Sequence, residues 1–407
     1  MTLSLTRRRG RLLLAAWVVI GACAESSREA LLSNTKVSVH SSTPAHAGRV
    51  ELVLTPEVEL GRDGVLFEDV VGASILSNGS FAVLDRAAAT LFYFDSTGVL
   101  LRRSGGPGGG PGEFRGRTGP TAMWRLQADS IGVWEHSLRR LSVFDAGGVF
   151  RRAWTAGRWT SYGWQALGRT QDGWIMAFVP PDSQGEEPTR RVGETFRPEV
   201  RYMAVPPDSA SVRELGARPG TEYFVQIGRT GQPSIAIRPF GAAPAHTVGG
   251  NELYYASGDR PEIILIGLDG DERLRITWDV GPRRLQRSAI AAHKEQLMAR
   301  APNTPARATW QRAVDAAPYP DSVPATRRLL LDSRGHLWAQ RYPLPGQDTV
   351  AWDVFDPAGT WDTSVMLPAS FEPLHIRSDR MIGVYVDRLG VQTIRVHRLL
   401  ATPAGLP

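Results

Sequence analysis

The stretch "RRLLLDSRGHLWAQRYPLPGQDTVAWDVFDPAGTWDTSVML", residues 327–367, decides the fold class of this chain. Four short apolar runs follow one another, and the turns around Gly335 and Gly359 have the composition of tight reversals. Short runs rich in β-branched and aromatic residues, joined by such turns, predict antiparallel strands. The stretch is therefore interpreted as one compact unit of four β-strands.

The same unit recurs along the chain from Val71 onward, in six copies. The first strands of the copies are "VGASILS", "TAMWRLQ", "WQALGRT", "HTVGG", "RRLLLD" and "PLHIRS". Repeats of about 40 to 50 residues built from four short antiparallel strands are typical of β-propellers. We therefore predict an all-β protein with the fold of a six-bladed β-propeller.

The ends of the repeat array predict how the ring closes. The sixth copy ends after "VQTIRVHRL" and lacks a fourth strand, whereas "RVELVLT", Arg49–Thr55, precedes the first copy without a local partner. Pairing this N-terminal strand with the last blade would close the ring and cover an exposed sheet edge. The predicted propeller domain covers residues 49–400, and the apolar stretch Pro233–Phe240 does not fit its strand count.

A helical insertion is predicted at about residues 283–316. Residues 284–300, "RLQRSAIAAHKEQLMAR", place apolar side chains on one side of a helix, and Ala306, Trp310 and Val314 continue at a spacing of four. Pro318 and Pro320 then stop the run. The insertion either packs against the domain or forms a lid, and the sequence leaves both interpretations open.

The N-terminus predicts export and lipid attachment. Four arginines precede the apolar run Leu12–Ile20, which is too short to span a bilayer and ends near Cys23, the only cysteine of the chain. This arrangement resembles a bacterial lipoprotein signal, so we predict a signal peptide at residues 1–22, lipid on Cys23 and a flexible tether at residues 23–48. Removing residues 1–22 lowers the formal net charge from +6 to +2, which argues against nucleic-acid binding.

The resemblance also implies where the protein resides. Ala24 and Glu25 follow Cys23, and neither is the aspartate that often keeps lipoproteins in the inner membrane. We expect a monomer in the bacterial cell envelope, anchored by lipid to the outer membrane and facing the periplasm or the exterior. Its membrane partner is then the bilayer that holds the lipid on Cys23.

The repeat pattern resembles six-bladed propellers of the NHL/TolB-like type. The third strands of the first, second and fifth copies end in Phe-Asp before a glycine turn. The segment "GGPGGGPGEF", residues 105–114, resembles a segment of bacterial six-bladed β-propeller lipoproteins of undefined function. The resemblance covers nearly all of residues 49–400. It implies an architecture and names no activity.

The glycine-rich segment does not have the chemistry of a phosphate-binding loop. Glu113 and Phe114 stand where such a loop needs lysine and serine or threonine, and Pro107 and Pro111 remove two N–H donors. A carboxylate at this place would repel a phosphate. We instead expect the segment to cross from the outer strand of one blade to the inner strand of the next, with Phe114 between the blades.

The predicted strand order assigns the long loops to one face. Links between second and third strands, and links between blades, emerge together and include every long insertion, so we expect ligands there. Polar residues ending the second strands should ring the mouth of this face. These candidate ligand-face residues are Asp85, Arg86, Glu135, His136, Asp259, Arg260, Arg341, Tyr342, Asp387 and Arg388. They could equally cap turns and pair across blades.

Two classes of function remain. The first is a lipid-anchored extracytoplasmic binding module for a peptide, a glycan or a protein partner. The second is a metal-dependent hydrolase or lyase of the gluconolactonase-like propeller type, in which carboxylates of inner strands hold a divalent ion. The inner strands offer Asp332 and few other ligands, and the histidines show no metal-binding spacing. We therefore favour a binding module without metal, cofactor or catalytic residues.

Overall fold

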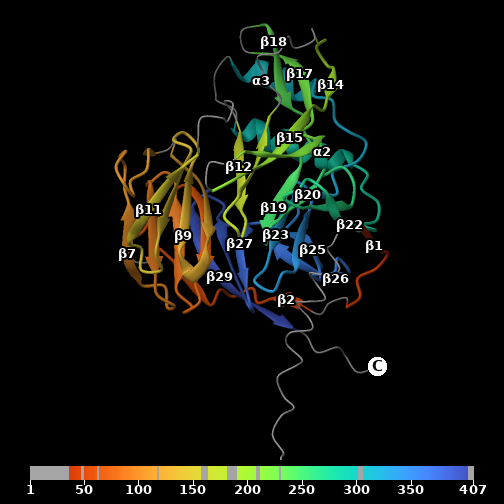
Figure 1. Cartoon of the computed structure of the whole chain (residues 1–407). Helices are drawn as coiled ribbons and strands as arrows, with labels where there is room; N and C mark the ends of the chain where they lie inside the picture. The colour runs from red at the N-terminus through yellow and green to blue at the C-terminus, as the bar shows by residue number, and fades with distance from the viewer. Residues whose placement is uncertain are drawn as a thin grey trace, which may run out of the picture.

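The computed structural model describes residues 36–46, 50–61, 64–116, 119–156, 164–180, 190–207, 211–228, 231–300 and 306–401. Within these residues the chain is mostly β-structure, arranged as seven small sheets (Figure 1). The signal segment and Cys23 lie outside the described residues. No helix in the described part of the chain is both long and apolar enough to cross a membrane.

Six of the sheets contain at least four strands and follow one another along the chain. The first contains β4 (Val70–Ile75), β5 (Phe81–Asp85), β6 (Thr90–Phe94) and β7 (Leu100–Gly105). The second contains β8 (Pro120–Arg125), β9 (Ile131–Glu135), β10 (Arg140–Phe144) and β11 (Phe150–Thr155), with the short helix η2 (Gln127–Asp129) between β8 and β9. The third contains β12 (Gln165–Arg169), β13 (Ile175–Val179), β15 (Glu199–Val205) and β16 (Arg213–Pro219).

The remaining three of these sheets repeat the pattern. The fourth contains β19 (Ala245–Gly249), β20 (Glu252–Ala256), β21 (Glu262–Ile266) and β22 (Glu272–Trp278). The fifth contains β23 (Thr326–Leu331), β24 (Leu337–Arg341), β25 (Thr349–Phe355) and β26 (Trp361–Pro368). The sixth contains β27 (Phe371–Arg377), β28 (Arg380–Val386) and β29 (Gln392–Ala401), together with β2 (Val50–Leu52) and β3 (Val58–Leu60) from the N-terminal region.

Within these six sheets the strands from β4 onward pair in antiparallel fashion in chain order, and the first strands of the sheets lie side by side. β4 contacts β8, and contacts continue from β8 to β12, β19, β23 and β27. β27 in turn contacts β4, so the last sheet lies beside the first. β2 and β3 pair with β29, on the edge where a fourth strand is missing from the C-terminal repeat.

The hydrophobic core lies between consecutive sheets. In β5, Phe81 and Val83 belong to a cluster shared with the sixth sheet, while Ala82 and Leu84 belong to one shared with the second. Because successive side chains of a strand point to opposite faces, burial of both faces requires a nearly continuous apolar run. Separate clusters fill the boundaries between the second and third, third and fourth, fourth and fifth, and fifth and sixth sheets.

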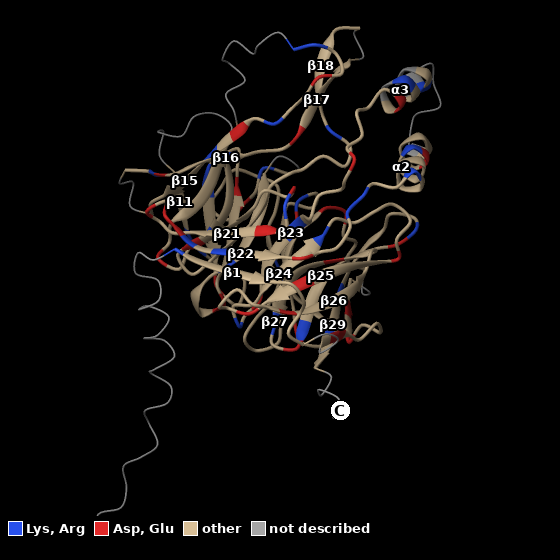
Figure 2. Cartoon of the chain, turned by 90° about the vertical axis from the view of Figure 1, so that its right-hand side faces the viewer, with Lys and Arg blue, Asp and Glu red and all other residues tan. Residues whose placement is uncertain are grey.

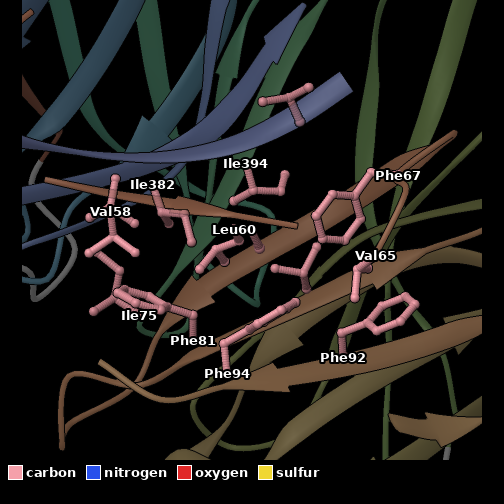
Figure 3. Close-up of a cluster of buried hydrophobic side chains, with 14 residues drawn as sticks. Val58, Leu60, Val65, Phe67, Ile75, Phe81, Phe92, Phe94, Ile382 and Ile394 are labelled. Atoms are coloured by element: carbon pink, nitrogen blue, oxygen red, sulfur yellow. The ribbon is translucent and has the colours of Figure 1, made fainter. Parts of the chain in front are cut away.

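The boundary between the sixth and first sheets contains the N-terminal strand β3. Figure 3 shows Val58 and Leu60 among Ile382 and Ile394 of the sixth sheet and Phe81 and Phe94 of the first. Leu60 is 1% exposed, and the ring of Phe67 lies 5.7 Å from that of Phe92 in an edge-to-face arrangement. The N-terminal region therefore contributes directly to the core.

Part of the predicted tether is a strand. β1 (Val37–Ser41) pairs in parallel with β22 and adds a fifth strand to the fourth sheet. Val37 and Val39 pack against the cluster between the fourth and fifth sheets, and the Nδ1 atom of His46 lies 2.6 Å from Asp362 Oδ1. The prediction of a tether through residue 48 is wrong for these residues, because alternating valines cover the outer edge of that sheet.

An additional sheet and two helices explain the stretches that did not fit six equal repeats. β14 (Thr195–Phe196), β17 (Tyr223–Ile227) and β18 (Pro233–Ile237) form a three-stranded sheet, and the unassigned stretch beginning at Pro233 supplies β18. The helices are α2 (Arg287–Arg300) and α3 (Ala306–Asp315), within the insertion predicted from the sequence. Leu285 and Ala289 pack with Phe240 and Val323, so this insertion has its own small core.

The glycine-rich segment crosses between the first and second sheets. The side chain of Phe114 is fully buried in the cluster that these sheets share, 5.9 Å from the ring of Phe144. Gly105 has a φ of +95°, and a β-carbon there would lie 2.5 Å from the Phe114 ring. Glycine is therefore needed at this position both for its backbone conformation and for the close approach of Phe114.

Candidate ligand-binding pocket

The links between strands divide the molecule into two faces. The upper face is defined by the links between second and third strands and between sheets, which carry β14, β17, β18, α2 and α3. The lower face is defined by the turns between first and second strands and between third and fourth strands. Figures 1 and 2 show the additional sheet and both helices gathered at one end of the molecule.

The described residues line a pocket of about 560 Å³ on the upper face and two pockets of about 360 Å³ each on the lower face. We call the largest one the upper pocket. It lies where β19, β23 and β27 begin and is lined by Pro244, Ala245, His246, Arg327, Arg328, Gln340, Pro343, Val350, Trp352, Pro368, Ala369, Phe371 and Glu372. Its volume is within the range of small-ligand sites.

Charged groups stand on two neighbouring strands of the upper pocket. Arg328 of β23 forms an ion pair with Glu372 of β27, between the fifth and sixth sheets. Burial lowers the pKa of Arg328, and the charge of Glu372 opposes this effect. Arg327 is exposed and forms no ion pair with another described residue. The pocket therefore presents one uncompensated cation beside an ion pair.

A neutral histidine forms another part of the wall. His246 Nε2 lies 2.7 Å from the hydroxyl of Tyr202, and its ring stacks on Phe178 with centroids 5.8 Å apart. Burial among these rings lowers the pKa of His246 to about 3, so the imidazole is uncharged at neutral pH. Burial also raises the pKa of Tyr202, which keeps its hydroxyl protonated. His246 and Tyr202 therefore hydrogen-bond to each other without adding a charge to the pocket wall.

The structure accounts for several predicted ligand-face residues by contacts inside the fold. Asp85 is fully buried and accepts hydrogen bonds from the backbone N–H groups of Glu68 at 2.8 Å and Ala88 at 3.0 Å. Glu135 is also fully buried and forms a 2.6 Å ion pair with Arg140. These carboxylates hold turns and a link between sheets, and neither is accessible to a ligand.

The remaining carboxylates at the second-strand ends are also engaged. Asp259 lies 3.2 Å from Arg197, and Arg260 lies 3.9 Å from Asp259. Asp387 accepts hydrogen bonds from the N–H groups of Leu389 at 2.8 Å and Val391 at 2.9 Å, which fixes a turn.

The other predicted residues differ in exposure. Arg86 pairs with Asp69 at 2.7 Å, and Arg388 is exposed. His136 is partly buried against Trp164, where burial and the charge of Arg139 lower its pKa.

Two predicted residues lie directly beside the upper pocket. Arg341 forms two hydrogen bonds of 2.8 and 2.9 Å with the fully buried Asp353, and Trp278 Nε1 donates to the same carboxylate at 3.0 Å. Tyr342 packs near Phe240 in the small core of the insertion, where burial raises its pKa. Both residues therefore hold the rim of the pocket in place, and the residues before and after them, Gln340 and Pro343, line it.

Sequence reasoning missed the polar residues of the upper pocket. The inner strands were expected to offer little besides Asp332, but His246, Arg328 and Glu372 all lie at the beginnings of such strands. They could have been found by examining the first residues after each long link, because each inner strand starts at the face that carries those links.

The described residues contain no group of three or more His, Cys, Asp or Glu side chains placed to hold a metal ion. Asp332 accepts hydrogen bonds from the N–H groups of Arg334 and His336 at 2.8 and 2.9 Å, in a turn of the lower face.

No family model and no curated protein matches the sequence. Solved structures of similar, propeller-like architecture include a member of the DUF4221 family from Bacteroides vulgatus, with 10% identity over 87% of this chain and 99% of that one and a TM-score of 0.48. A gluconolactonase from Xanthomonas campestris has 12% identity over 89% and 99% and a TM-score of 0.40. Virginiamycin B lyase from Staphylococcus aureus has 11% identity over 87% and 99% and a TM-score of 0.39. None of these likenesses assigns an activity to this chain.

Proposed function

We propose that the chain is a six-bladed β-propeller lipoprotein of the NHL/TolB-like type, in which each of the six large sheets is a blade. The antiparallel pairing in chain order and the contacts between successive first strands support this assignment. The pairing of β2 and β3 with β29 supports closure of the ring by the N-terminal region. This pairing covers the edge of β29, which the C-terminal repeat leaves without a fourth strand.

The proposed function is that of an extracytoplasmic binding module, held to the outer membrane by lipid on Cys23, whose upper pocket binds a partner. Rigid blades carry all the long links on one face, which suits ligand recognition there. The observation that carries the proposal is the upper pocket itself, which places the uncompensated cation Arg327 beside the ion pair of Arg328 and Glu372.

Among peptide, glycan and protein partners, the upper pocket favours a peptide segment. Arg327 suits a carboxylate, and the neighbouring pair of Arg328 and Glu372 can exchange hydrogen bonds with peptide groups. Pro343 and Pro368 add rigid apolar surface without N–H groups that would need a partner. A short acidic and apolar segment of a partner protein would complement these features.

The test is selection of peptides from a random displayed library on the immobilised protein, followed by affinity measurements with purified variants. Arg327→Glu should weaken the selected peptides about tenfold or more, because it replaces a charge-assisted hydrogen bond by repulsion. Arg334→Glu is the matched control, since Arg334 is exposed in a lower-face turn of the same sheet. Equal loss in both variants, or binding indifferent to Arg327, would contradict the assignment.

A further inference from the structure

A second pocket lies on the lower face, between the second and third sheets. This lower pocket has a volume of about 360 Å³ and is lined by Leu126, Gln127, Ser130, Leu141, Val143, Arg152, Ala153, Trp154, Arg169, Gln171, Gly173 and Pro207. Leu126, Leu141 and Val143 give it an apolar wall, and Trp154 adds a partly exposed indole. It is separate from the upper pocket and shares no lining residue with it.

The charge of the lower pocket is one-sided. Arg152 comes from the outer strand β11 and Arg169 from the end of the inner strand β12, and the described lining residues include no aspartate or glutamate. Neither arginine forms an ion pair with another described residue. Burial and the nearby charge of Arg152 both lower the pKa of Arg169, so the two guanidinium groups are close enough to repel each other.

The acidic residues nearest in sequence are engaged elsewhere. Asp145 pairs with Arg151, Asp129 pairs with Arg125, and Asp172 accepts a 2.8 Å hydrogen bond from Asn251 of the fourth sheet. The first two contacts neutralise their carboxylates, whereas Asp172 keeps its charge, directs Oδ2 toward Asn251 and does not line the lower pocket. Two guanidinium groups at the edge of a partly apolar pocket are therefore left with unused hydrogen-bonding capacity toward an anion.

We propose that the lower pocket binds a small organic anion, whose carboxylate or phosphate lies between Arg152 and Arg169 and whose apolar body lies against Trp154. Guanidinium groups bind both kinds of oxyanion through paired hydrogen bonds. Gln127, Ser130 and Gln171 supply neutral donors and acceptors for polar substituents of the ligand. The pocket volume suits a molecule of one ring rather than a polymer.

The test is calorimetric titration of the full-length protein in neutral detergent with phenyl phosphate, benzoate, inorganic phosphate and the uncharged benzamide. Phenyl phosphate or benzoate should bind, benzamide should bind at least about tenfold more weakly, and added salt should weaken the charged probes. Inorganic phosphate binding as tightly as phenyl phosphate would overturn the role given to Trp154. Benzamide binding as tightly as benzoate would overturn the role of the arginines, and no binding of any probe would overturn the site.

Arginine variants test whether the charged probes bind in the lower pocket. Arg152→Gln and Arg169→Gln should each weaken the charged probes about tenfold or more. Arg334→Gln is the matched control, because Arg334 is an exposed arginine in a lower-face turn of the fifth sheet and does not line the lower pocket. Arg152 is exposed, so its variant keeps the test valid if Arg169→Gln fails to fold. Unchanged affinity in Arg152→Gln, or equal loss in Arg334→Gln, would contradict the proposal.

Discussion

At the scale of single residues, the glycine-rich segment shows how one position can combine two constraints. Gly105 adopts a φ of +95°, which L-residues with a side chain rarely adopt, and its α-carbon lies against the ring of Phe114. Arg140 donates a 3.2 Å hydrogen bond to the carbonyl of Gly110 and pairs with buried Glu135. Arg140 thus fixes the glycine-rich segment to the second sheet, and Glu135 compensates the charge of Arg140.

Gly105→Ala should lower the free energy of unfolding by about 2 to 4 kcal/mol, through backbone strain and a clash with Phe114. Gly109→Ala is the matched control in the same segment, because a β-carbon at Gly109 meets nothing within 4 Å. The control should change stability by no more than about 0.5 kcal/mol. Equilibrium denaturation in urea measures both variants, and equal losses would show that Phe114 does not impose the constraint.

Buried histidines make stability depend on pH. The pKa of His246 is lowered to about 3 and that of His375 to about 4, in both cases mainly by burial. In the unfolded chain each of these histidines binds a proton near pH 6.5, whereas in the folded protein each binds one only near its lowered pKa. The free energy of unfolding is therefore unaffected by the two groups above pH 6.5, and it falls as the pH falls from there toward the lowered pKa values. The native protein should therefore become less stable in mild acid.

For His246 alone, lowering the pH from about 7.5 to about 5 should reduce the free energy of unfolding by about 2 kcal/mol. His246→Gln removes this titration, so the variant should have a shallower dependence of stability on pH over this range, whatever its absolute stability. Urea denaturation at several pH values gives both slopes. His375→Gln should change the slope in the same direction, and parallel slopes for wild type and His246→Gln would disprove the assignment.

The sequence could predict which residues end the second strands but not what they contact. Asp85 and Glu135 follow apolar strands just as ligand-binding carboxylates do, and their partners lie in links whose path depends on the whole fold. Arg328 and Glu372 form an ion pair across two sheets and are far apart in sequence. Such pairings have no local signal, which is why the upper pocket was not anticipated residue by residue.

At the scale of elements, the strands within the six sheets could be predicted because each carries its own apolar run and turn. β1 could not, because its alternating pattern matches an exposed edge strand and a polar linker equally well. β17 and β18 belong to a sheet outside the repeat, so the repeat gave no register for them. Helix α3 was predicted close to its observed bounds because Ala306, Trp310 and Val314 recur at a spacing of four, which differs from the alternation of strands.

Truncation tests whether the N-terminal strands close the proposed ring. A mature chain that begins at residue 64 lacks β1, β2 and β3, and it exposes the free edge of β29 together with the core around Ile394. Loss of the buried side chains Leu52, Val58 and Leu60 should cost about 5 kcal/mol. A chain that begins at residue 48 lacks β1 alone and should lose much less. Similar unfolding midpoints for these two chains would contradict closure.

At the scale of the whole molecule, the two faces differ in the links they carry. The upper face has the additional sheet, the helices and a pocket with charges of both signs. The lower face has short turns, the lower pocket with its arginines, and another pocket lined by several aspartates. A lipid anchor at the N-terminus would hold the domain near a membrane without inserting either face into the bilayer. The strand β1 sets a limit on the tether, which can extend no further than residue 35 before the chain joins the described domain.

The lipid prediction can be tested on the intact protein in a bacterial host. Cys23→Ala should abolish incorporation of labelled palmitate, because the thiol is the only one in the chain and the acceptor that the signal resembles. Ser26→Ala, in the predicted tether, should retain the label. Ala24→Asp should retain the label but move the protein to inner-membrane fractions on a density gradient, since aspartate directly after the lipidated cysteine often causes retention there. Label persisting in Cys23→Ala would exclude this anchor, and unchanged fractionation of Ala24→Asp would argue against sorting by this position.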